Sequence, residues 1–438
     1  MKKIIISLLI LLVLAGLMVG LMFSFKICPP QGPWPTPPWC QEKNFVRNNF
    51  TIKTETLTLA QIKAVNMFDT WGRNYNFGML ENTRDNITNS FDRVKALGAS
   101  EVYVHDFHRA VYQGKTDFSS TNYQIVDDVF LNDFRDEALT PADLNNLAKN
   151  AHDRGLKIGV KHNLTFVDMG KYLLSGLKGD IQKNTENDYA AFNKVHGEAW
   201  IKDYFSKWQD RLVARAKMYQ SAGIDIMSIT PTFMGPTFAG QEILANSLEK
   251  NLIKEIKKVF SGQIYAELSL YGVLDGRDGQ ENWSLYDYYK DADIKEARLY
   301  YFPEKYRLAG SPSEKNMEPV FNLIFNDLET FAAKNKIKLT LFFSPFSYDN
   351  AINNGLVEFY DARNENVINK KQNWQHQADA YQAMFKALAG RKEIERLNVG
   401  GFWWDDAMDP EIKPRVSLNG SPRNKIAEEI IKQWFNAR

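Results

Sequence analysis

The sequence predicts an α/β fold, a (β/α)8 TIM barrel preceded by an N-terminal transmembrane helix and a Pro-rich linker. From about Ile62, short apolar segments alternate with amphipathic helical segments, which is typical of a parallel sheet covered by helices. Eight such units fit into residues 51–438, as in a barrel with enlarged loops. The alternative is an open doubly wound sheet. No glycine-rich phosphate loop follows any predicted strand, which removes the usual nucleotide-binding version of that sheet.

Residues 1–26 are predicted to be a membrane anchor. Lys2 and Lys3 precede an uncharged run from Ile4 to Phe25, which is long enough as a helix to span about 30 Å of hydrocarbon. The end of this run makes a poor cleavage site. We therefore expect an uncleaved anchor over residues 4–25, with the barrel at the cell surface, outside the cytoplasm. A cleaved signal peptide, followed by secretion, is the alternative.

Residues 27–50 are predicted to be a linker, which contains the segment CPPQGPWPTPPWC. Cys28 and Cys40 are the only two cysteines of the chain, and in an oxidising compartment we expect them to form one disulfide. The prolines between them favour extended, stiff backbone, as in a spacer. A docking loop that exposes Trp34 and Trp39 is the alternative.

The barrel elements follow from apolar runs and their end signals. Thr140 is a predicted N-cap, with Pro141 at the first helical position and Asp143 two residues later. Gly98 and Gly223 each end a predicted helix. The predicted strands are Ala64–Phe68, Glu101–His105, Lys157–Lys161, Ile224–Ile229, Gln263–Leu268, Ala297–Phe302, Lys338–Phe343 and Val399–Trp404. The predicted helices are Asn86–Leu97, Pro141–Arg154, Glu198–Ala222, Gln241–Phe260, Glu318–Asn335, Gln375–Ala389 and Asn424–Asn436.

Composition excludes some partners. The formal net charge is +1, whereas a nucleic-acid binder needs a basic surface, so we expect no nucleic-acid partner. Aromatic residues make up 13% of the chain, with ten Trp. They suit a large core, and they also suit a cleft in which rings stack on a sugar. We expect a monomer.

In a barrel of this kind, function lies where the strands end at their carboxyl side. The polar and aromatic residues at the predicted strand ends are Asp69, Trp71, Arg73, Asn74, Asp106, His108, Arg109, Tyr112, Lys161, His162, Asn163, Asp168, Thr230, Thr232, Glu267, Tyr271, Tyr301, Glu304, Ser344, Ser347, Tyr348, Asp349, Trp403, Trp404, Asp405 and Asp406. His105 is expected in the barrel wall. The middle strands carry no further His, so we expect no metal and no other cofactor. A Gly-x-Ser-x-Gly elbow is absent, and the barrel contains no cysteine for a thiol nucleophile.

Several segments resemble glycoside hydrolase family 113, the β-mannanase-like barrels. These segments are TPADLNNLAKNAHDRGLKIGVKHNLTF, ARAKMYQSAGIDIMSI, QADAYQAMFKAL, VGGFWWDD and SPRNKIAEEIIKQWF. The resemblance implies a glycosidase-like barrel with a carbohydrate ligand. In that family, a glutamate at the end of strand 4 is the acid/base and a glutamate at the end of strand 7 is the nucleophile. The matching positions here hold Thr232 and Ser344, which cannot replace a carboxylate.

Two hypotheses for the function follow. The first is an exported glycoside hydrolase whose carboxylates have moved, with Glu267 and Asp405 or Asp406 as the best replacements and Asp106 next. The alternative is a structural role without catalysis. For Glu267 this role is an ion pair inside the cleft rim, and for the two aspartates it is loop capping or a salt bridge with Arg73 or Lys161.

The second hypothesis is a non-catalytic carbohydrate-binding or cell-surface module on a glycosidase fold. In both cases the expected sugar-binding residues are Trp71, Arg73, Asn74, His108, Lys161, His162, Asn163, Tyr271, Tyr301, Tyr348, Trp403 and Trp404. The density of acids, amides and aromatic rings at the strand ends favours the enzyme.

Overall fold

The computed structural model describes residues 59–67, 83–112, 120–126, 128–131, 134–167, 196–231, 236–354, 370–402 and 418–437. The predicted anchor over residues 4–25 and the predicted Cys28–Cys40 disulfide lie outside these residues. Within the described part of the chain, no helix combines the length and hydrophobicity that crossing a membrane requires.

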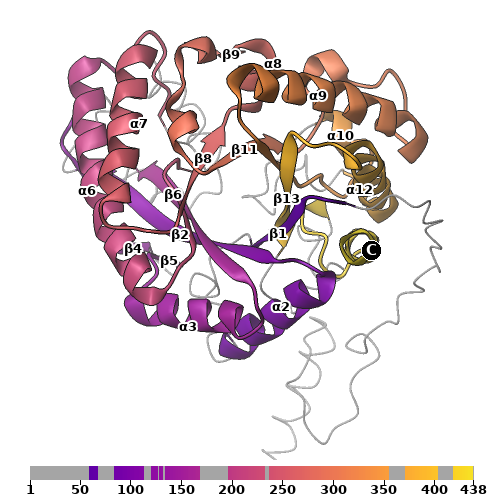
Figure 1. The fold of residues 1–438 in the computed structure, drawn as a ribbon, viewed down its shortest axis with the longest axis horizontal. Coiled ribbons are helices and arrows are strands. Elements are labelled where there is room, and N and C mark those ends of the chain that lie inside the picture. Colours follow the sequence, from indigo (N-terminus) through magenta and orange to yellow (C-terminus); the bar gives the residue numbers. More distant parts are fainter. Residues whose placement is uncertain are drawn as a thin grey trace, which may run out of the picture. The chain divides into compact units, whose positions relative to one another are not determined.

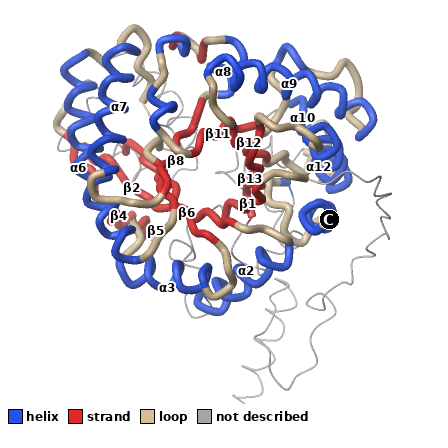
Figure 2. The backbone as a smooth tube through the Cα atoms, viewed as in Figure 1, coloured by secondary structure: helices blue, strands red, loops and turns tan. Residues whose placement is uncertain are grey.

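Eight parallel strands close into a barrel. Each strand pairs with the next along the chain, and β1 pairs with both β2 and β13, which closes the ring. The closed ring confirms the predicted (β/α)8 barrel and excludes an open sheet. Figures 1 and 2 show the strands enclosed by a ring of helices. The barrel strands are β1 (Ile62–Met67), β2 (Glu101–Tyr112), β6 (Lys157–Val167), β7 (Ile226–Ser228), β8 (Gln263–Leu268), β11 (Ile294–Leu299), β12 (Leu339–Phe343) and β13 (Ile394–Phe402).

Two outer helices, α3 and α6, have the end signals that the sequence predicts. Thr140 forms a capping box with Asp143, in which each side chain binds the other residue's backbone N–H. Gly223 ends α6 with φ 78°, a left-handed conformation that glycine adopts without a steric penalty. The outer helices are α2 (Thr83–Leu97), α3 (Pro141–His152), α6 (Glu198–Ala222), α7 (Glu242–Lys257), α9 (Glu314–Asn335), α12 (Trp374–Leu388) and α14 (Ile426–Asn436).

Short additional strands and helices lie along the chain between the barrel strands and the outer helices. β3 pairs antiparallel with the end of β2, while β4 with β5 and β9 with β10 form separate two-stranded ribbons. These elements are β3 (Tyr123–Val126), β4 (Asp128–Leu131), β5 (Phe134–Glu137), α8 (Leu270–Asp275), β9 (Arg277–Asp278), β10 (Glu281–Asn282), η2 (Trp283–Leu285), η3 (Tyr288–Asp291), η4 (Glu304–Tyr306) and α10 (Ala351–Asn354).

The base of the barrel interior is an apolar layer. It consists of buried side chains from five strands, namely Ala64, Tyr103, Ile226, Tyr265 and Ile294. Gly159 leaves room for one of these rings, because a Cβ at Gly159 would lie 2.5 Å from Tyr103. Gly400 does the same for Phe342, where a Cβ would lie 1.9 Å from the ring. Rings thus pack closely against bare backbone both at the base, at Tyr103, and near the carboxyl end of the barrel, at Phe342.

Several strand boundaries differ from the sequence prediction. β13 begins at Ile394, five residues before the predicted Val399, and β2, β6 and β11 also differ. β2 and β6 continue to Tyr112 and Val167, and they stay paired from Glu101 opposite Lys157 to Val111 opposite Val167. The prediction ended both strands early because polar residues follow, but neighbouring helices satisfy those residues. β11 begins and ends three residues before the predicted strand Ala297–Phe302. That error left Glu296 outside the predicted strand and placed Arg298 near the start of the strand instead of near its end.

Candidate functional site

A chain of alternating charges crosses the barrel interior. Lys161 Nζ lies 2.7 Å from Glu296 Oε1, and Arg298 Nε lies 3.1 Å from the same oxygen. The other arm of Arg298 places Nη2 2.5 Å from Glu267 Oε1. We call Lys161, Glu296, Arg298 and Glu267 the interior ion-pair chain. It links β6, β11 and β8 and carries no net charge.

The inner half of this chain is fully enclosed. The side chains of Lys161 and Glu296 are 0% exposed, and Lys161 Nζ lies 4.5 Å from the centre of the Tyr265 ring. Burial lowers the pKa of Lys161 to about 8, although Glu296 acts to raise it. Burial alone would raise the pKa of Glu296, but Lys161 and Arg298 hold it below its ordinary value. Each buried charge is thus compensated by its neighbour, as a low-dielectric interior requires.

The outer half of the chain reaches the ends of the strands. Glu267 and Arg298 are each the penultimate residue of their strand, and their side chains are 10% and 12% exposed. Thr230 Oγ1 accepts a hydrogen bond from the Glu267 N–H, at 3.2 Å, and Tyr288 donates one to the Glu267 carbonyl, at 3.3 Å. The ion pair that we considered as an alternative for Glu267 is therefore present. Its partner is Arg298, and the pair lies at the carboxyl end of the barrel.

Aromatic residues lie beside Arg298 and on the segments that follow the two strands. Tyr300 hydrogen-bonds to Arg298, and burial raises the pKa of Tyr300 to about 12 despite the opposing effect of Arg298. Tyr271 and Tyr301 hydrogen-bond to each other, so the structure brings together two residues that we expected to bind sugar. Burial, and then this hydrogen bond, raise the pKa of Tyr271. Both tyrosines follow the strands that carry Glu267 and Arg298.

A histidine held by two amides lies on the same interior surface. Asn163 Nδ2 lies 2.9 Å from His105 Nδ1, and His105 Nε2 lies 3.0 Å from Asn66 Oδ1. This arrangement suits a neutral ring that accepts from Asn163 and donates to Asn66. Burial, with Lys161 and Arg298 nearby, lowers the pKa of His105 well below its ordinary value. His105 is therefore a neutral residue of the barrel wall, as expected, and it orders the β1, β2 and β6 side of the interior.

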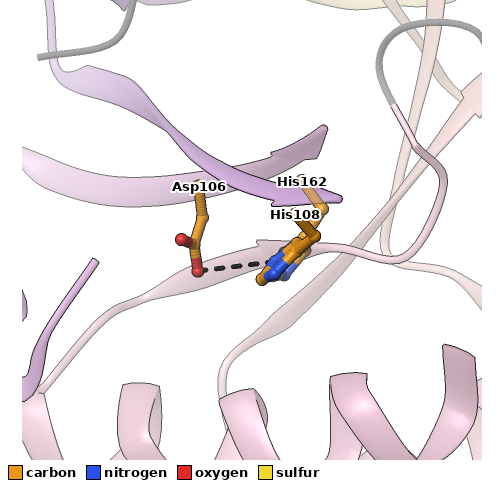
Figure 3. Close-up of side chains that lie close together, drawn as sticks. All are labelled: Asp106, His108 and His162. Carbon is orange, nitrogen blue, oxygen red and sulfur yellow. Dashed lines mark hydrogen bonds and ion pairs between the residues drawn. The ribbon is translucent and has the colours of Figure 1, made fainter. Parts of the chain in front are cut away.

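Asp106, His108 and His162 lie on the opposite face of β2 and β6 (Figure 3). The Asp106 carboxylate accepts a hydrogen bond from the Leu139 N–H, at 2.8 Å, and pairs with Arg215 of α6, at 2.5 Å. Tyr219, also on α6, donates to the same carboxylate. The histidines join through His108 Nε2 and His162 Nδ1, 3.0 Å apart.

These three residues were expected at the sugar-binding end, but the structure places them between the barrel wall and α6. All three are fully buried, and the edge of Trp208 packs against both imidazole rings. Because side chains alternate along a strand, Lys161 and Asn163 point inward and His162 between them points outward. Asp106 therefore lies outside the barrel interior, apart from Glu267 and Arg298.

The same three residues could offer ligand atoms to a metal. One atom from each of Asp106, His108 and His162 lies within 4.8 Å of the others. Burial lowers the pKa of His162 well below its ordinary value, so it is neutral, as metal binding requires. However, the Arg215 guanidinium already neutralises Asp106, and a divalent ion would have to displace it. The cluster is best explained as an enclosed hydrogen-bond network.

Ser344, which the sequence resemblance matched to the nucleophile position of the family, is buried at the end of β12. Ser344 directly follows β12, is 3% exposed, and donates to the Gly420 carbonyl at 3.4 Å. Nearby, Lys425 Nζ donates to Ser347 Oγ and to the Asn419 carbonyl, at 2.9 and 3.0 Å. Tyr348 is buried, packs against Ala351 and Leu418, and has Lys370 5.2 Å from its ring centre. These contacts join the segment after β12 to the chain that leads into α14.

Many expected site residues lie outside the described residues. They are Asp69, Trp71, Arg73, Asn74, Asp168, Thr232, Trp403, Trp404, Asp405 and Asp406. The expected partnership of Glu267 with Asp405 or Asp406 therefore stays a prediction. Glu296 and Arg298 were missed, although the alternation of Ile294, Glu296 and Arg298 could have indicated a strand with these side chains on one face.

Comparison with known proteins addresses the fold. No family model matches the sequence, and no curated protein matches it. Among solved structures, one GH113 β-1,4-mannanase has a TM-score of 0.54 at 15% identity, covering 86% of this chain and 99% of that chain. The fold is that of the GH113 β-mannanases.

Two further solved structures are similar to this chain in fold. The GH113 β-mannanase AaManA from Alicyclobacillus acidocaldarius, in complex with ManMIm, has a TM-score of 0.52 at 13% identity, over 87% of this chain and 97% of that chain. A glycoside hydrolase family 5 mannosidase from Rhizomucor miehei, in complex with mannosyl-fructose, has a TM-score of 0.50 at 10% identity, over 86% of this chain and 92% of that chain. At these identities the likeness concerns the barrel, and the chemistry must be argued from this chain's own residues.

Proposed function

We propose that this protein is a glycoside hydrolase that acts on an oligosaccharide or polysaccharide at the carboxyl end of its barrel. The observation that carries the proposal is Glu267, a carboxylate at the end of β8 held by Arg298, with Tyr271 and Tyr301 on the segments that follow. A charged carboxylate beside aromatic rings suits a sugar, because rings stack on sugar faces while polar groups bind hydroxyls. The mannan-acting proteins that share the fold make a mannose-containing glycan the first substrate to test.

Hydrolysis of a glycosidic bond generally needs two carboxyl groups at the reacting centre. We propose that Asp405 or Asp406 supplies the second one, because both closely follow β13 in the sequence. Asp106 is not included, since its carboxylate pairs with Arg215 between the barrel and α6.

One observation favours a non-catalytic carbohydrate-binding module as the second candidate. The Ser344 hydroxyl binds the Gly420 carbonyl, and Ser344 is the residue that the sequence resemblance matches to the nucleophile of the family. A barrel can keep its sugar-binding surface after losing such a carboxylate. For either function, we propose that residues 4–25 anchor the protein in the membrane with the barrel exported, and that a cleaved signal sequence is the alternative.

The test is hydrolysis of β-1,4-mannohexaose and a panel of other oligosaccharides by the wild-type protein, Glu267→Gln and Asp405→Asn. Each variant should lower kcat by several orders of magnitude and still bind the sugar, because an amide keeps the shape but cannot act as a carboxylate. Lys305→Met is the control, since its ion pair with Asp275 is half exposed on the surface. Wild-type protein that binds glycans and cleaves none would support the binding module. Full activity in both variants would show that other acids are responsible.

A further inference from the structure

The guanidinium of Arg298 lies between two carboxylates. Its Nε faces Glu296 Oε1 at 3.1 Å, and its Nη2 faces Glu267 Oε1 at 2.5 Å. A guanidinium is planar, so the directions of its N–H groups are fixed relative to one another. Because Glu296 binds Nε of the planar guanidinium, it also fixes the position at which Nη2 can bind Glu267.

Glu296 is itself firmly held. Its Oε1 receives Lys161 Nζ at 2.7 Å, and its Oε2 receives Asn398 Nδ2 at 2.7 Å. These donors come from β6 and β13, and Glu296 is 0% exposed on β11. Glu267 is thus tied, through Arg298, to the barrel wall rather than to a surface loop. Sites held by strands keep their geometry better than sites held by loops.

Arg298 also determines which form of the carboxylate is favoured. Burial acts to lower the pKa of Arg298, but Glu267 and the other neighbouring acidic groups raise it well above its ordinary value. Arg298 therefore keeps its charge, and a guanidinium at this distance stabilises the charged form of a carboxylate. A charged carboxylate has no proton to give, so it is suited to attack or to accept a proton.

We propose that Arg298 is a positioning residue that holds Glu267 as a charged carboxylate, so that Glu267 is the nucleophile or base and another group is the proton donor. This inference rests on the proposed hydrolase function. In a retaining course, a Glu267 oxygen bonds to the anomeric carbon, the glycosidic C–O bond breaks, and the leaving oxygen takes a proton from the acid. Water then attacks that carbon and releases Glu267, while the acid recovers its proton from the water. In an inverting course, Glu267 takes a proton from the water that attacks the carbon, and the leaving oxygen again takes its proton from the acid.

The first experiment is the pH profile of kcat/KM on β-1,4-mannohexaose for the wild-type protein, Arg298→Gln and Arg298→Lys. Without the guanidinium, a larger share of Glu267 is protonated at a given pH. The acidic limb should therefore move to higher pH by about 1–3 units in Arg298→Gln, and by less in Arg298→Lys, while the basic limb stays. If Glu267 were the proton donor, the basic limb would move instead, which would overturn the proposal.

Arg391→Gln is the matched control. Arg391 is 12% exposed, as Arg298 is, and pairs with Glu329 at 2.6 Å, but it lies before β13 at the other end of the barrel. Neither limb should move in this variant. Circular dichroism and thermal unfolding check that the variants are folded, and Arg298→Lys keeps the test open if Arg298→Gln does not fold.

The second experiment needs no activity. Coupling of glycine ethyl ester to Glu267 by a water-soluble carbodiimide proceeds through the protonated carboxyl group, and mass spectrometry of the Glu267 peptide measures its extent. The midpoint of the pH dependence should be at least one unit higher in Arg298→Gln than in the wild-type protein and in Arg391→Gln. Equal midpoints would overturn the proposed role of Arg298. A shifted midpoint in a protein that cleaves no glycan would instead support the role of Arg298 and contradict the hydrolase function.

Discussion

The two faces of β2 and β6 carry two buried polar networks, which differ in whether their charged residues reach the end of the barrel. On the inner face, Lys161 belongs to the interior ion-pair chain, whose outer members are partly exposed at the end of the barrel. On the outer face, Asp106 is fully enclosed and pairs with Arg215, and His108 Nε2 lies 3.7 Å from its carboxylate. The inner network ends in a partly exposed ion pair, Glu267 with Arg298, near the ends of two strands. The outer network joins the barrel wall to α6, and its charges reach no surface.

The comparison shows that burial of a charged residue says little about its role until its partners are known. Arg298 pairs with two carboxylates of the described residues, Glu267 and Glu296, and keeps one if the other is removed. Arg215 has Asp106 as its carboxylate partner in the described structure, together with the Leu139 carbonyl at 2.6 Å. Breaking the outer pair should therefore cost far more folding free energy than breaking the pair at the barrel end.

The largest expected effect is that of Asp106→Asn. The substitution keeps the size of the side chain but puts a neutral amide in place of the carboxylate that faces the buried Arg215 charge, and this should lower the free energy of unfolding by about 3–5 kcal/mol. Urea unfolding at pH 7 measures it. Glu329→Gln, which breaks the partly exposed pair with Arg391, should cost less than about 1 kcal/mol. A loss of under 1 kcal/mol in Asp106→Asn would mean that the outer network is not structural.

The next effect concerns a buried carboxylate that has no cationic partner among the described residues. Glu249 of α7 is 7% exposed, its Oε2 has no hydrogen-bond partner among the described residues, and burial raises its pKa to about 8. A raised pKa means that the folded state holds the proton more tightly, so stability falls as pH rises from about 4.5 to 8.

Glu249→Gln should therefore reduce this pH dependence. Relative to the wild-type protein, the variant should gain at least about 2 kcal/mol in the free energy of unfolding between pH 5 and pH 8. Urea unfolding at both pH values tests this. Parallel pH dependences in the two proteins would show that Glu249 reaches a partner or water when it ionises.

A smaller effect is expected for Glu267→Gln. Arg298 keeps Glu296, and the pair lies partly exposed at the end of the barrel, so the loss in unfolding free energy should be about 1–2 kcal/mol, less than half that of Asp106→Asn. Urea unfolding of both variants under the same conditions gives the ratio. Equal losses would contradict the distinction between the two networks.

The smallest effect is expected from metal ions. Because Arg215 neutralises Asp106, we expect Zn²⁺, and separately EDTA, to change the Tm by no more than about 1 °C. Differential scanning calorimetry measures this. A rise of several degrees with Zn²⁺ that disappears in His108→Ala would show that Asp106, His108 and His162 bind a metal after all.

Local signals in the sequence were sufficient for the barrel and for many of its boundaries. The predicted bounds of α6 and β8 match the structure, because a left-handed Gly223 and a short apolar run are signals that act within a few residues. The end of β2 could not be predicted in this way. Asp106 and His108 look like loop residues in the sequence, and it is α6, more than ninety positions further along the chain, that satisfies them.

The sequence by itself determined the fold class, the helix caps and the presence of Glu267 at a strand end, since each depends on periodicity or on neighbours in the chain. Only the tertiary structure decided which buried charges meet. Arg298 reaches Glu267 across 31 positions, and Lys161 reaches Glu296 across 135. Such pairs depend on strand register and on the alternation of side chains across the barrel wall, and a shift of one residue would turn each of them to the opposite face.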